Sequence, residues 1–283
     1  MAGCLYLVGV PIGNDDDITL RALKILKQVD IIAAEDTRKA RRLLSAHNIA
    51  PKKLVAHHSF NEQDSAKGLL SWLEEGEDVA LISDAGMPTV SDPGYVAAKA
   101  ALAAELPVEI IPGVSAVSTA IAGSGLPGTP YLFAGFLPKK EGETKKFLEE
   151  LKPRPETLIF FDSPRRMLKS LAWLQDVLGN RQAALCRELT KTHQEWLRGS
   201  LSEIESALQA RESVLGEITL VVAGAGDIDK AQQAEQTLLS LEEAILKGLE
   251  SGLKPRALRD ELALKYNLSK REIYQQILAA SHK

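Results

Sequence analysis

Acidic side chains directly follow short apolar segments of this sequence, at positions where a general base could act. Glu35 and Asp36 come immediately after the apolar segment 31–34, and Asp84 follows a later segment of the same kind. If these segments are parallel strands, their carboxyl ends open on one crevice of the sheet. A carboxylate there could accept a proton from a weak nucleophile, and Arg38 could hold a phosphate or a carboxylate. The alternative interpretation is a local ion pair with Arg38.

Three loops rich in glycine and proline also follow apolar segments, at 9–14, 83–94 and 112–116. Glycine permits a close backbone approach, and proline fixes the shape of a loop while removing a backbone donor. Such loops present rigid carbonyls and few amides, which suits a flat polar ligand better than a polyphosphate. The first loop lacks the third glycine of a dinucleotide fingerprint, and no Walker pattern is present. Nucleotide hydrolases and NAD enzymes are therefore disfavoured.

Apolar segments alternate with amphipathic ones through the first 122 residues, which predicts a mainly parallel α/β sheet. The predicted strands are 5–8, 31–34, 54–56, 79–82 and 108–111. The predicted helices are 19–28, 39–47, 62–75, 95–105 and 115–122, and we expect the acidic cluster Asp15–Asp17 to cap the first of them. These elements position the candidate loops at one edge of the sheet.

The segment 123–130 is dense in glycine and proline and is the best candidate for a linker. After it, strands are predicted at 132–135, 157–161, 183–187 and 217–223, with helices at 143–151, 166–178 and 201–211. Near the end, Pro255 marks a helix start, and Ser269 with Glu272 forms a capping box. We expect an N-terminal α/β domain (1–122), a second α/β domain (123–230) and a helical tail resembling a helix-turn-helix (231–283).

Composition is that of an ordinary soluble globular protein, with 283 residues, 45% of them apolar and 25% charged. The two cysteines have neither metal-ligand nor disulfide spacing, and no apolar run approaches the roughly 18 residues that span a bilayer. A cytoplasmic protein without a metal site or a membrane partner is expected. The net charge of −4 requires segregated charge if nucleic acid binds, and from 254 to 283 basic residues outnumber acidic ones by seven to three.

Taken in order and spacing, the three loops resemble those of the tetrapyrrole-methylase-like family of S-adenosylmethionine-dependent methyltransferases. Further motifs resemble its small-subunit ribosomal RNA methyltransferase I branch: Asp17–Leu23, Ala34–Arg38, His58–Glu62, Ser163–Arg166, Cys186–Lys191 and Gly216–Ile218. The resemblance covers nearly the whole chain. It implies a homodimeric enzyme with a cofactor cleft between two α/β domains. The implied reaction is methylation of the ribose 2′-hydroxyl of a cytidine in the decoding region of 16S rRNA.

Candidate cofactor contacts come chiefly from the loops 83–87 and 111–116, and the resemblance adds residues near the first loop and in the second domain. The complete set is Pro11, Ser83, Asp84, Ala85, Gly86, Met87, Ile111, Ser115, Ala116, Phe161, Leu189, Ile218 and Thr219. Asp84 could accept a hydrogen bond from an ammonium group or from a ribose hydroxyl. The alternative for each single loop is ordinary turn chemistry.

Candidate contacts to 16S rRNA in the small ribosomal subunit are His58, Arg165, Arg166, Lys254, Arg256, Lys270 and Arg271. The alternative for the tail residues is a solvated helical cap. Asp162 and Arg165 depart from the branch pattern, which has glutamate and histidine there, so the role of Asp162 is open. Two other functions stay open as well. One is a corrinoid or tetrapyrrole precursor methyltransferase, and the other is a noncatalytic ribosome assembly factor.

Overall fold

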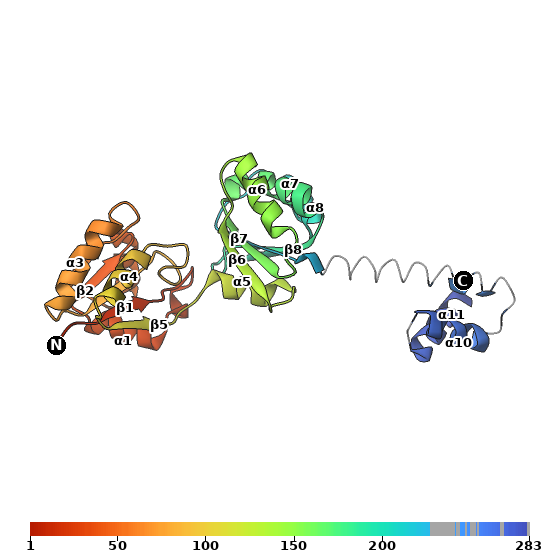
Figure 1. The fold of residues 1–283 in the computed structure, drawn as a ribbon, viewed down its shortest axis with the longest axis horizontal. Coiled ribbons are helices and arrows are strands. Elements are labelled where there is room, and N and C mark those ends of the chain that lie inside the picture. Colours follow the sequence, from red (N-terminus) through yellow and green to blue (C-terminus); the bar gives the residue numbers. More distant parts are fainter. Residues whose placement is uncertain are drawn as a thin grey trace. The chain divides into compact units, whose positions relative to one another are not determined.

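The computed structural model describes residues 1–226, 241, 244–246, 248–249, 253, 255–266 and 269–281. The chain divides into two compact units, Met1–Ala223 and Gly224–Lys283 (Figure 1). The larger unit contains two five-stranded sheets with helices packed on them. The α/β fold predicted from the sequence is therefore confirmed. Among the described residues, no helix combines the length and the apolar character that a membrane span requires.

The first sheet is entirely parallel and has the strand order β3-β2-β4-β1-β5. Its strands are β1 (Leu5–Val8), β2 (Ile31–Ala34), β3 (Lys53–Ala56), β4 (Val79–Ile82) and β5 (Val108–Ile111). Strands β1, β2 and β4 read as continuous apolar runs because helices cover both faces of the sheet. The order places β1 and β4 at the centre, with the loops that follow them at the same edge.

Alternate residues of the central strands enter two different cores of the first sheet. Helices α1 (Leu20–Gln28) and α2 (Thr37–Ala46) pack on the face that carries Ile32 and Ile82. Helices α3 (Glu62–Glu74) and α4 (Tyr95–Ala103) pack on the face that carries Ile31 and Leu81. A one-residue slip of any central strand would exchange these two sets of side chains, so the packing specifies the register.

The second sheet is mixed and has the order β6-β7-β10-β8-β9. Its strands are β6 (Tyr131–Phe136), β7 (Thr157–Asp162), β8 (Gln182–Arg187), β9 (Glu195–Ser200) and β10 (Ile218–Val222). Only β6 and β7 pair in parallel, and the other pairs are antiparallel. Helices α6 (Glu141–Leu151), α7 (Met167–Leu178) and α8 (Leu201–Gln209) share a core with one face of this sheet.

Helix α5 (Ala116–Ser124) packs on the other face of the second sheet, against β8 and β10. The chain therefore leaves the first sheet between Ile111 and Ala116. This differs from the sequence analysis, which placed the helix with the first domain and a linker at 123–130. Gly123 contributes to this packing, because a Cβ there would lie 2.3 Å from the Trp196 ring of β9. The glycine allows α5 to approach the second sheet closely.

The start of α1 also differs from the prediction. Asp15–Asp17 form a separate 3-10 turn, and the N-cap of α1 is Thr19, whose hydroxyl accepts a hydrogen bond from the Ala22 amide at 3.1 Å. Threonine is a favourable N-cap because its side chain satisfies one of the free amides of the first turn. The acidic cluster therefore precedes the helix and does not cap it.

The smaller unit has a core of its own. Helix α10 (Pro255–Tyr266) and helix α11 (Lys270–Ser281) bury Leu258, Leu262, Ile273 and Ile277 together with residues before α10. Pro255 begins α10, and the Ser269 hydroxyl bonds to the Glu272 carboxylate at 2.7 Å in a capping box. Both sequence predictions for this region are thus confirmed. Lys254 lies outside the described residues.

Two glycines allow the loops after β1 and β5 to cross. A Cβ on Gly113 would lie 2.8 Å from the Cα of Gly9, and a Cβ on Gly9 would lie 2.7 Å from the Gly113 amide nitrogen. Backbone atoms cannot move aside as a flexible side chain can, so a methyl group here would separate the loops. The close approach of these loops depends on both glycines.

We expect Gly113→Ala to lower the free energy of unfolding by about 1–3 kcal/mol, because it overpacks a backbone crossing. Gly68→Ala is the matched control: Gly68 lies inside α3 with nothing within 4 Å of its Cβ position. The control should raise the free energy by roughly 0.5–1 kcal/mol through helix propensity. Urea unfolding of both variants measures the difference. Equal stability of the two variants would contradict this account of the crossing.

Candidate active-site cleft

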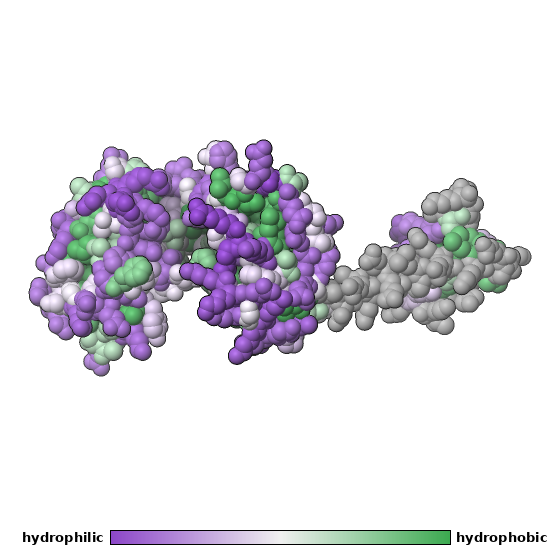
Figure 2. Space-filling model, turned by 90° about the horizontal axis from the view of Figure 1, so that it is seen from above, coloured by the Kyte–Doolittle hydropathy of each residue, from purple (hydrophilic) through white to green (hydrophobic). Residues whose placement is uncertain are grey.

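A cleft of 830 Å³ opens where the loops of the first sheet meet those of the second (Figure 2). The first sheet contributes the loops after β1, β2, β4 and β5 and one side of α2. The second sheet contributes residues at the ends of β6 and β7, the loop before β9 and the start of β10. The apolar part of the lining includes Ile12, Met87, Phe136, Phe161 and Ile218. Apolar walls with a few polar groups are typical of a small-molecule site.

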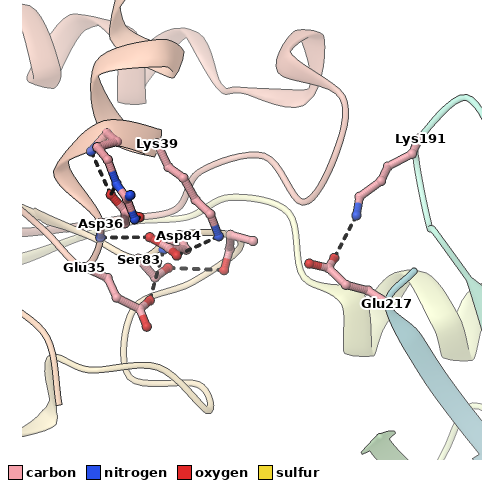
Figure 3. A network of polar contacts seen from close by, with 9 residues as sticks. Glu35, Asp36, Lys39, Ser83, Asp84, Lys191 and Glu217 are labelled. Carbon is pink, nitrogen blue, oxygen red and sulfur yellow. Dashed lines mark hydrogen bonds and ion pairs between the residues drawn. The ribbon is translucent and has the colours of Figure 1, made fainter. Parts of the chain in front are cut away.

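Asp84 ties the loop after β4 to the start of α2 (Figure 3). Its Oδ1 accepts a hydrogen bond from the Asp36 amide at 2.9 Å, and its Oδ2 pairs with the Lys39 Nζ at 2.8 Å. In return, the Glu35 Oε2 accepts a hydrogen bond from the Asp84 amide at 3.3 Å. Each loop thus satisfies a backbone donor of the other, which fixes the position of the carboxylates in the cleft.

Asp36 and Arg38 form the local ion pair that the sequence left as an alternative. The Asp36 carboxylate accepts from the Arg38 amide at 2.8 Å, as the N-cap of α2, and from its guanidinium Nε at 3.0 Å and Nη2 at 2.7 Å. These bonds, chiefly the one to the guanidinium, lower the pKa of Asp36. Neither residue lines the cleft. This geometry makes Asp36 a weak base and a good helix cap.

Glu35 and Asp92 are the carboxylates in the cleft that hold protons more tightly than usual. Burial raises the pKa of Glu35. Burial, together with the negative charges of Glu35, Asp84 and Glu217, raises the pKa of Asp92 to about 7. In the described part of the chain, the Asp92 carboxylate makes neither a hydrogen bond nor an ion pair. An unpaired carboxylate that titrates near neutral pH is suited to accept a proton.

The loop that carries Asp92 has an unusual backbone. Thr89 and Ser91 both have positive φ, at 73° and 68°, although neither is glycine. The end of the loop is held by Glu62, whose Oε1 accepts hydrogen bonds from the amides of Gly94 at 2.8 Å and Val96 at 3.4 Å. Left-handed residues of this kind are costly and collect at functional sites. The anchored loop keeps Asp92 in the cleft.

On the opposite side of the cleft, Lys191 connects the two sheets. Its Nζ pairs with Glu188 at 2.8 Å and with Glu217 at 3.0 Å, and Figure 3 shows the Glu217 carboxylate directed toward the Asp84 network. The Lys191 stem passes over Gly13, where a Cβ would lie only 2.3 Å from its Cγ. Gly13 is therefore required for the contact between the loop after β1 and the second sheet.

The loop after β7 is held from inside by Asp162. Its buried carboxylate accepts hydrogen bonds from the Ser163 amide at 2.7 Å, from the Arg166 Nε at 2.8 Å and from the Ser170 hydroxyl. Arg166 also donates to the carbonyls of Leu137 and Pro138 at 2.8 and 3.0 Å. These contacts give Asp162 a structural role, a question that the sequence left open.

Known proteins similar to this chain show which family it belongs to. The family described as Tetrapyrrole (Corrin/Porphyrin) Methylases matches residues 4–205. The chain belongs to the tetrapyrrole methylase family. A ribosomal RNA small subunit methyltransferase I from Micromonospora olivasterospora is 43% identical over 286 residues, covering 100% of this chain and 88% of that protein. A protein of the same name from Halalkalibacterium halodurans is 42% identical, covering 96% and 93%.

A solved structure gives the same family fold. A cobalt precorrin-4 methyltransferase of cobalamin biosynthesis aligns with a TM-score of 0.57 and 19% identity, and the alignment covers 78% of this chain and 94% of that one. At this identity the likeness concerns the methylase fold alone. The family resemblance drawn from the sequence motifs is confirmed by these comparisons.

Most of the predicted cofactor contacts of this methylase line the cleft. Those that do are Pro11, Ser83, Asp84, Ala85, Gly86, Met87, Ser115, Ala116, Phe161, Ile218 and Thr219. Ile111 and Leu189 do not, because both are buried in hydrophobic cores. Of the predicted catalytic residues, only Glu35 lines the cleft. Cofactor binding by these residues stays a prediction.

The predicted RNA contacts are scattered over the described surface. Arg165, Arg256 and Arg271 are exposed, whereas Lys270 pairs with Asp260 at 3.1 Å. Arg166 is engaged in the fold of its own loop. His58 packs edge-on against Phe60, away from the lining of the cleft. Lys254 lies outside the described residues. RNA binding by this set also stays a prediction.

Sequence reasoning did not single out Asp92, Lys39, Lys191 or Glu217 as site residues. Asp92 lies in the loop 83–94 that the sequence did indicate, and an acidic residue between serine and proline there was an available signal. Lys191 and Glu217 lie in the motifs 186–191 and 216–218 that carry the family resemblance, although no role was assigned to either side chain. Lys39 carried no such signal, because its role depends on a partner 45 positions away.

We expect Asp92→Asn to stabilise the folded methylase at alkaline pH. The folded pKa of about 7 lies above the ordinary value of 3.8, so the stability that Asp92 contributes is present below pH 4 and is lost as the pH rises through 7. The variant should therefore melt a few degrees above the natural protein at pH 8, and the two should converge near pH 4. Thermal melts across this range measure the effect.

Asp64→Asn, on the exposed surface of α3, is the control and should follow the natural protein at every pH. A constant difference between the Asp92 variant and the natural protein would mean that Asp92 is ionised throughout.

Proposed function

We propose that the protein is an S-adenosylmethionine-dependent methyltransferase that modifies ribosomal RNA, and that its target is the ribose 2′-hydroxyl of a cytidine in the decoding region of 16S rRNA. The observation that carries this proposal is the extent of the likeness to the curated methyltransferases. It covers 96–100% of the chain, including the smaller helical unit. A tetrapyrrole methylase of known structure matches only 78% of the chain.

The charge of the cleft supports the proposed cofactor. Glu35, Asp84, Asp92 and Glu217 all line it, and within the described residues only Lys39 and Lys191 form ion pairs with members of this set. S-adenosylmethionine carries a sulfonium, an ammonium and one carboxylate, so its net charge is positive, and an acidic and partly apolar cleft fits its two cationic groups and its adenine. Phe136 and Phe161, whose rings meet edge to face with centroids 5.4 Å apart, provide an apolar wall. The residues present therefore fit the cofactor.

Asp92 is the best placed proton acceptor for the proposed reaction. When bound, the sulfonium cofactor supplies an electrophilic methyl group. The Asp92 carboxylate would take the proton of the attacking ribose hydroxyl as the oxygen–carbon bond forms and the carbon–sulfur bond breaks. Glu35, whose pKa is also raised, is the second candidate. Asp36 is disfavoured because Arg38 lowers its pKa and occupies both of its oxygens.

The remaining parts of the proposal concern the setting of the reaction. We propose the small ribosomal subunit as substrate, a homodimer as the active form and the cytoplasm as location. The exposed cations Arg256 and Arg271 of the helical unit support a contact with RNA from that unit.

The first test is transfer of a labelled methyl group from S-adenosylmethionine to unmodified small subunits, to naked 16S rRNA and to a tetrapyrrole precursor. We expect label in subunit RNA at a single alkali-resistant linkage, since a 2′-O-methyl group removes the hydroxyl that attacks the phosphodiester. Label in the tetrapyrrole would reassign the enzyme to cofactor biosynthesis. Cofactor binding without any transfer would favour a noncatalytic assembly factor.

A second test separates the proton acceptor from the cofactor site. Asp92→Asn should lower kcat by about 10²–10⁴-fold, the usual contribution of a general base. Activity of the natural enzyme should rise with pH through about 7, because only the ionised carboxylate accepts a proton. The variant should lose this dependence while calorimetric cofactor affinity is retained.

Glu35→Gln is the comparison for this test. If it abolishes the pH dependence and Asp92→Asn does not, the base is Glu35.

A further inference from the structure

Helix α2 carries an unusual concentration of positive charge at the edge of the cleft. Its ten residues, Thr37–Ala46, include Arg38, Lys39, Arg41 and Arg42 and not a single acid. All four are exposed, while Ala40 and Leu44 face the core. The protein as a whole has a net charge of −4. Helix α2 is therefore strongly positive although the chain as a whole has a net negative charge.

The stability of the helix does not account for this composition. Like charges three and four positions apart repel each other, by about 0.2–0.5 kcal/mol per pair in isolated helices. Cations in the first turn also oppose the helix dipole, which favours acidic side chains there. Two helical lysines elsewhere have an acidic partner three or four positions away, Lys67 with Asp64 and Lys145 with Glu141. Helix α2 lacks such compensation within its own sequence.

The first two cations of α2 are engaged, and the other two are not. Arg38 pairs with Asp36, and Lys39 pairs with Asp84. Within the described part of the chain, Arg41 and Arg42 form neither an ion pair nor a hydrogen bond through their side chains. Arg42 lines the cleft, next to Lys39 and Leu43. Two free guanidinium groups are thus presented to solvent, and that of Arg42 belongs to the lining of the cleft.

We infer that Arg41 and Arg42 form a phosphate-binding surface for the RNA strand that enters the cleft. This inference rests on the proposed function and identifies where the first sheet holds its substrate. The floor of the cleft is acidic and repels phosphates, so the strand needs cations at the rim. Guanidinium groups meet phosphate oxygens in a bidentate manner, and such contacts position a nucleic acid without reading its sequence.

The side of the cleft formed by the second sheet is consistent with an RNA strand that enters along α2. Ser163 and Pro164 line it, and the next residue, Arg165, is exposed. A strand whose target ribose lies in the cleft would therefore meet α2 on the first sheet and the loop after β7 on the second. The two cations of α2 are not among the residues that the sequence motifs indicated.

The test is RNA binding by the double variant R41Q/R42Q in the full-length protein, measured with naked 16S rRNA over a range of salt concentrations. Loss of two phosphate contacts should weaken binding on the order of tenfold at physiological salt, and the slope of log affinity against log salt should decrease by about 1–2. R41K/R42K should restore most of the slope, because the charge is kept.

The control is K99Q/R154Q, which removes two charges elsewhere. Lys99 lies on α4, on the opposite face of the first sheet, and Arg154 precedes β7, at the end away from the cleft. The control should bind RNA as the natural protein does. Cofactor affinity should be unchanged in the control, and R41Q/R42Q should be at least as stable as the natural protein, since repulsion within α2 is relieved.

An unchanged salt slope in R41Q/R42Q, with methyl transfer to RNA intact in the natural protein, would overturn the inference and leave the proposed function standing. Equal losses in the control would likewise overturn it, because the effect would then be one of net charge. If the natural protein itself neither binds nor methylates RNA, the proposed function fails together with it.

Discussion

The reciprocal contact between the loops after β2 and β4 is the constraint on which the site depends. Asp84 holds the Asp36 amide and Lys39, and Glu35 holds the Asp84 amide. Through these bonds, the same two loops that carry the acidic groups of the cleft also set the start of α2. The same hydrogen bonds therefore determine both the orientation of the basic helix α2 and the position of the carboxylates. Removing the Asp84 carboxylate would release both.

The site brings opposite charges close together without neutralising them completely. Carboxylates line the cleft, where a cationic ligand would compensate them, and cations occupy the exposed surface of α2 beside it. The raised pKa of Asp92 is a measure of this segregation, because it reflects burial near Glu35, Asp84 and Glu217. A protein with a net charge of −4 can therefore present a basic surface where an anionic polymer needs it.

Much of the fold was predictable from the sequence, since β1, β2 and β4 of the first sheet are continuous apolar runs and the capping box at Ser269 has a strong local signal. The strand β9 was not predicted. It lies at the edge of the second sheet, its residues are mostly half-buried, and it shows neither alternation nor a run of apolar residues. The packing of α5 on the second sheet was also not predicted. A helix of small residues has the same sequence pattern whichever sheet it packs against.

In the candidate site, too, some features were predictable from local sequence and others depend on contacts between distant residues. Most of the cofactor contacts predicted from the loops and from the family resemblance line the cleft, because glycine and proline are informative about local backbone shape. The role of Asp36 as a helix cap, and that of Asp162 as an internal support for its loop, depend on partners that the folded chain supplies. Ion pairs between distant positions, such as Lys39 with Asp84, have no local signature.

The separate core of the helical unit has a consequence for the history of the chain. Leu258, Leu262, Ile273 and Ile277 are buried within that unit, so its addition to a methylase would leave no unfilled space in the larger unit. A gene fusion could attach or remove such a module in one event. Such an event would leave the hydrophobic cores of the larger unit as they are.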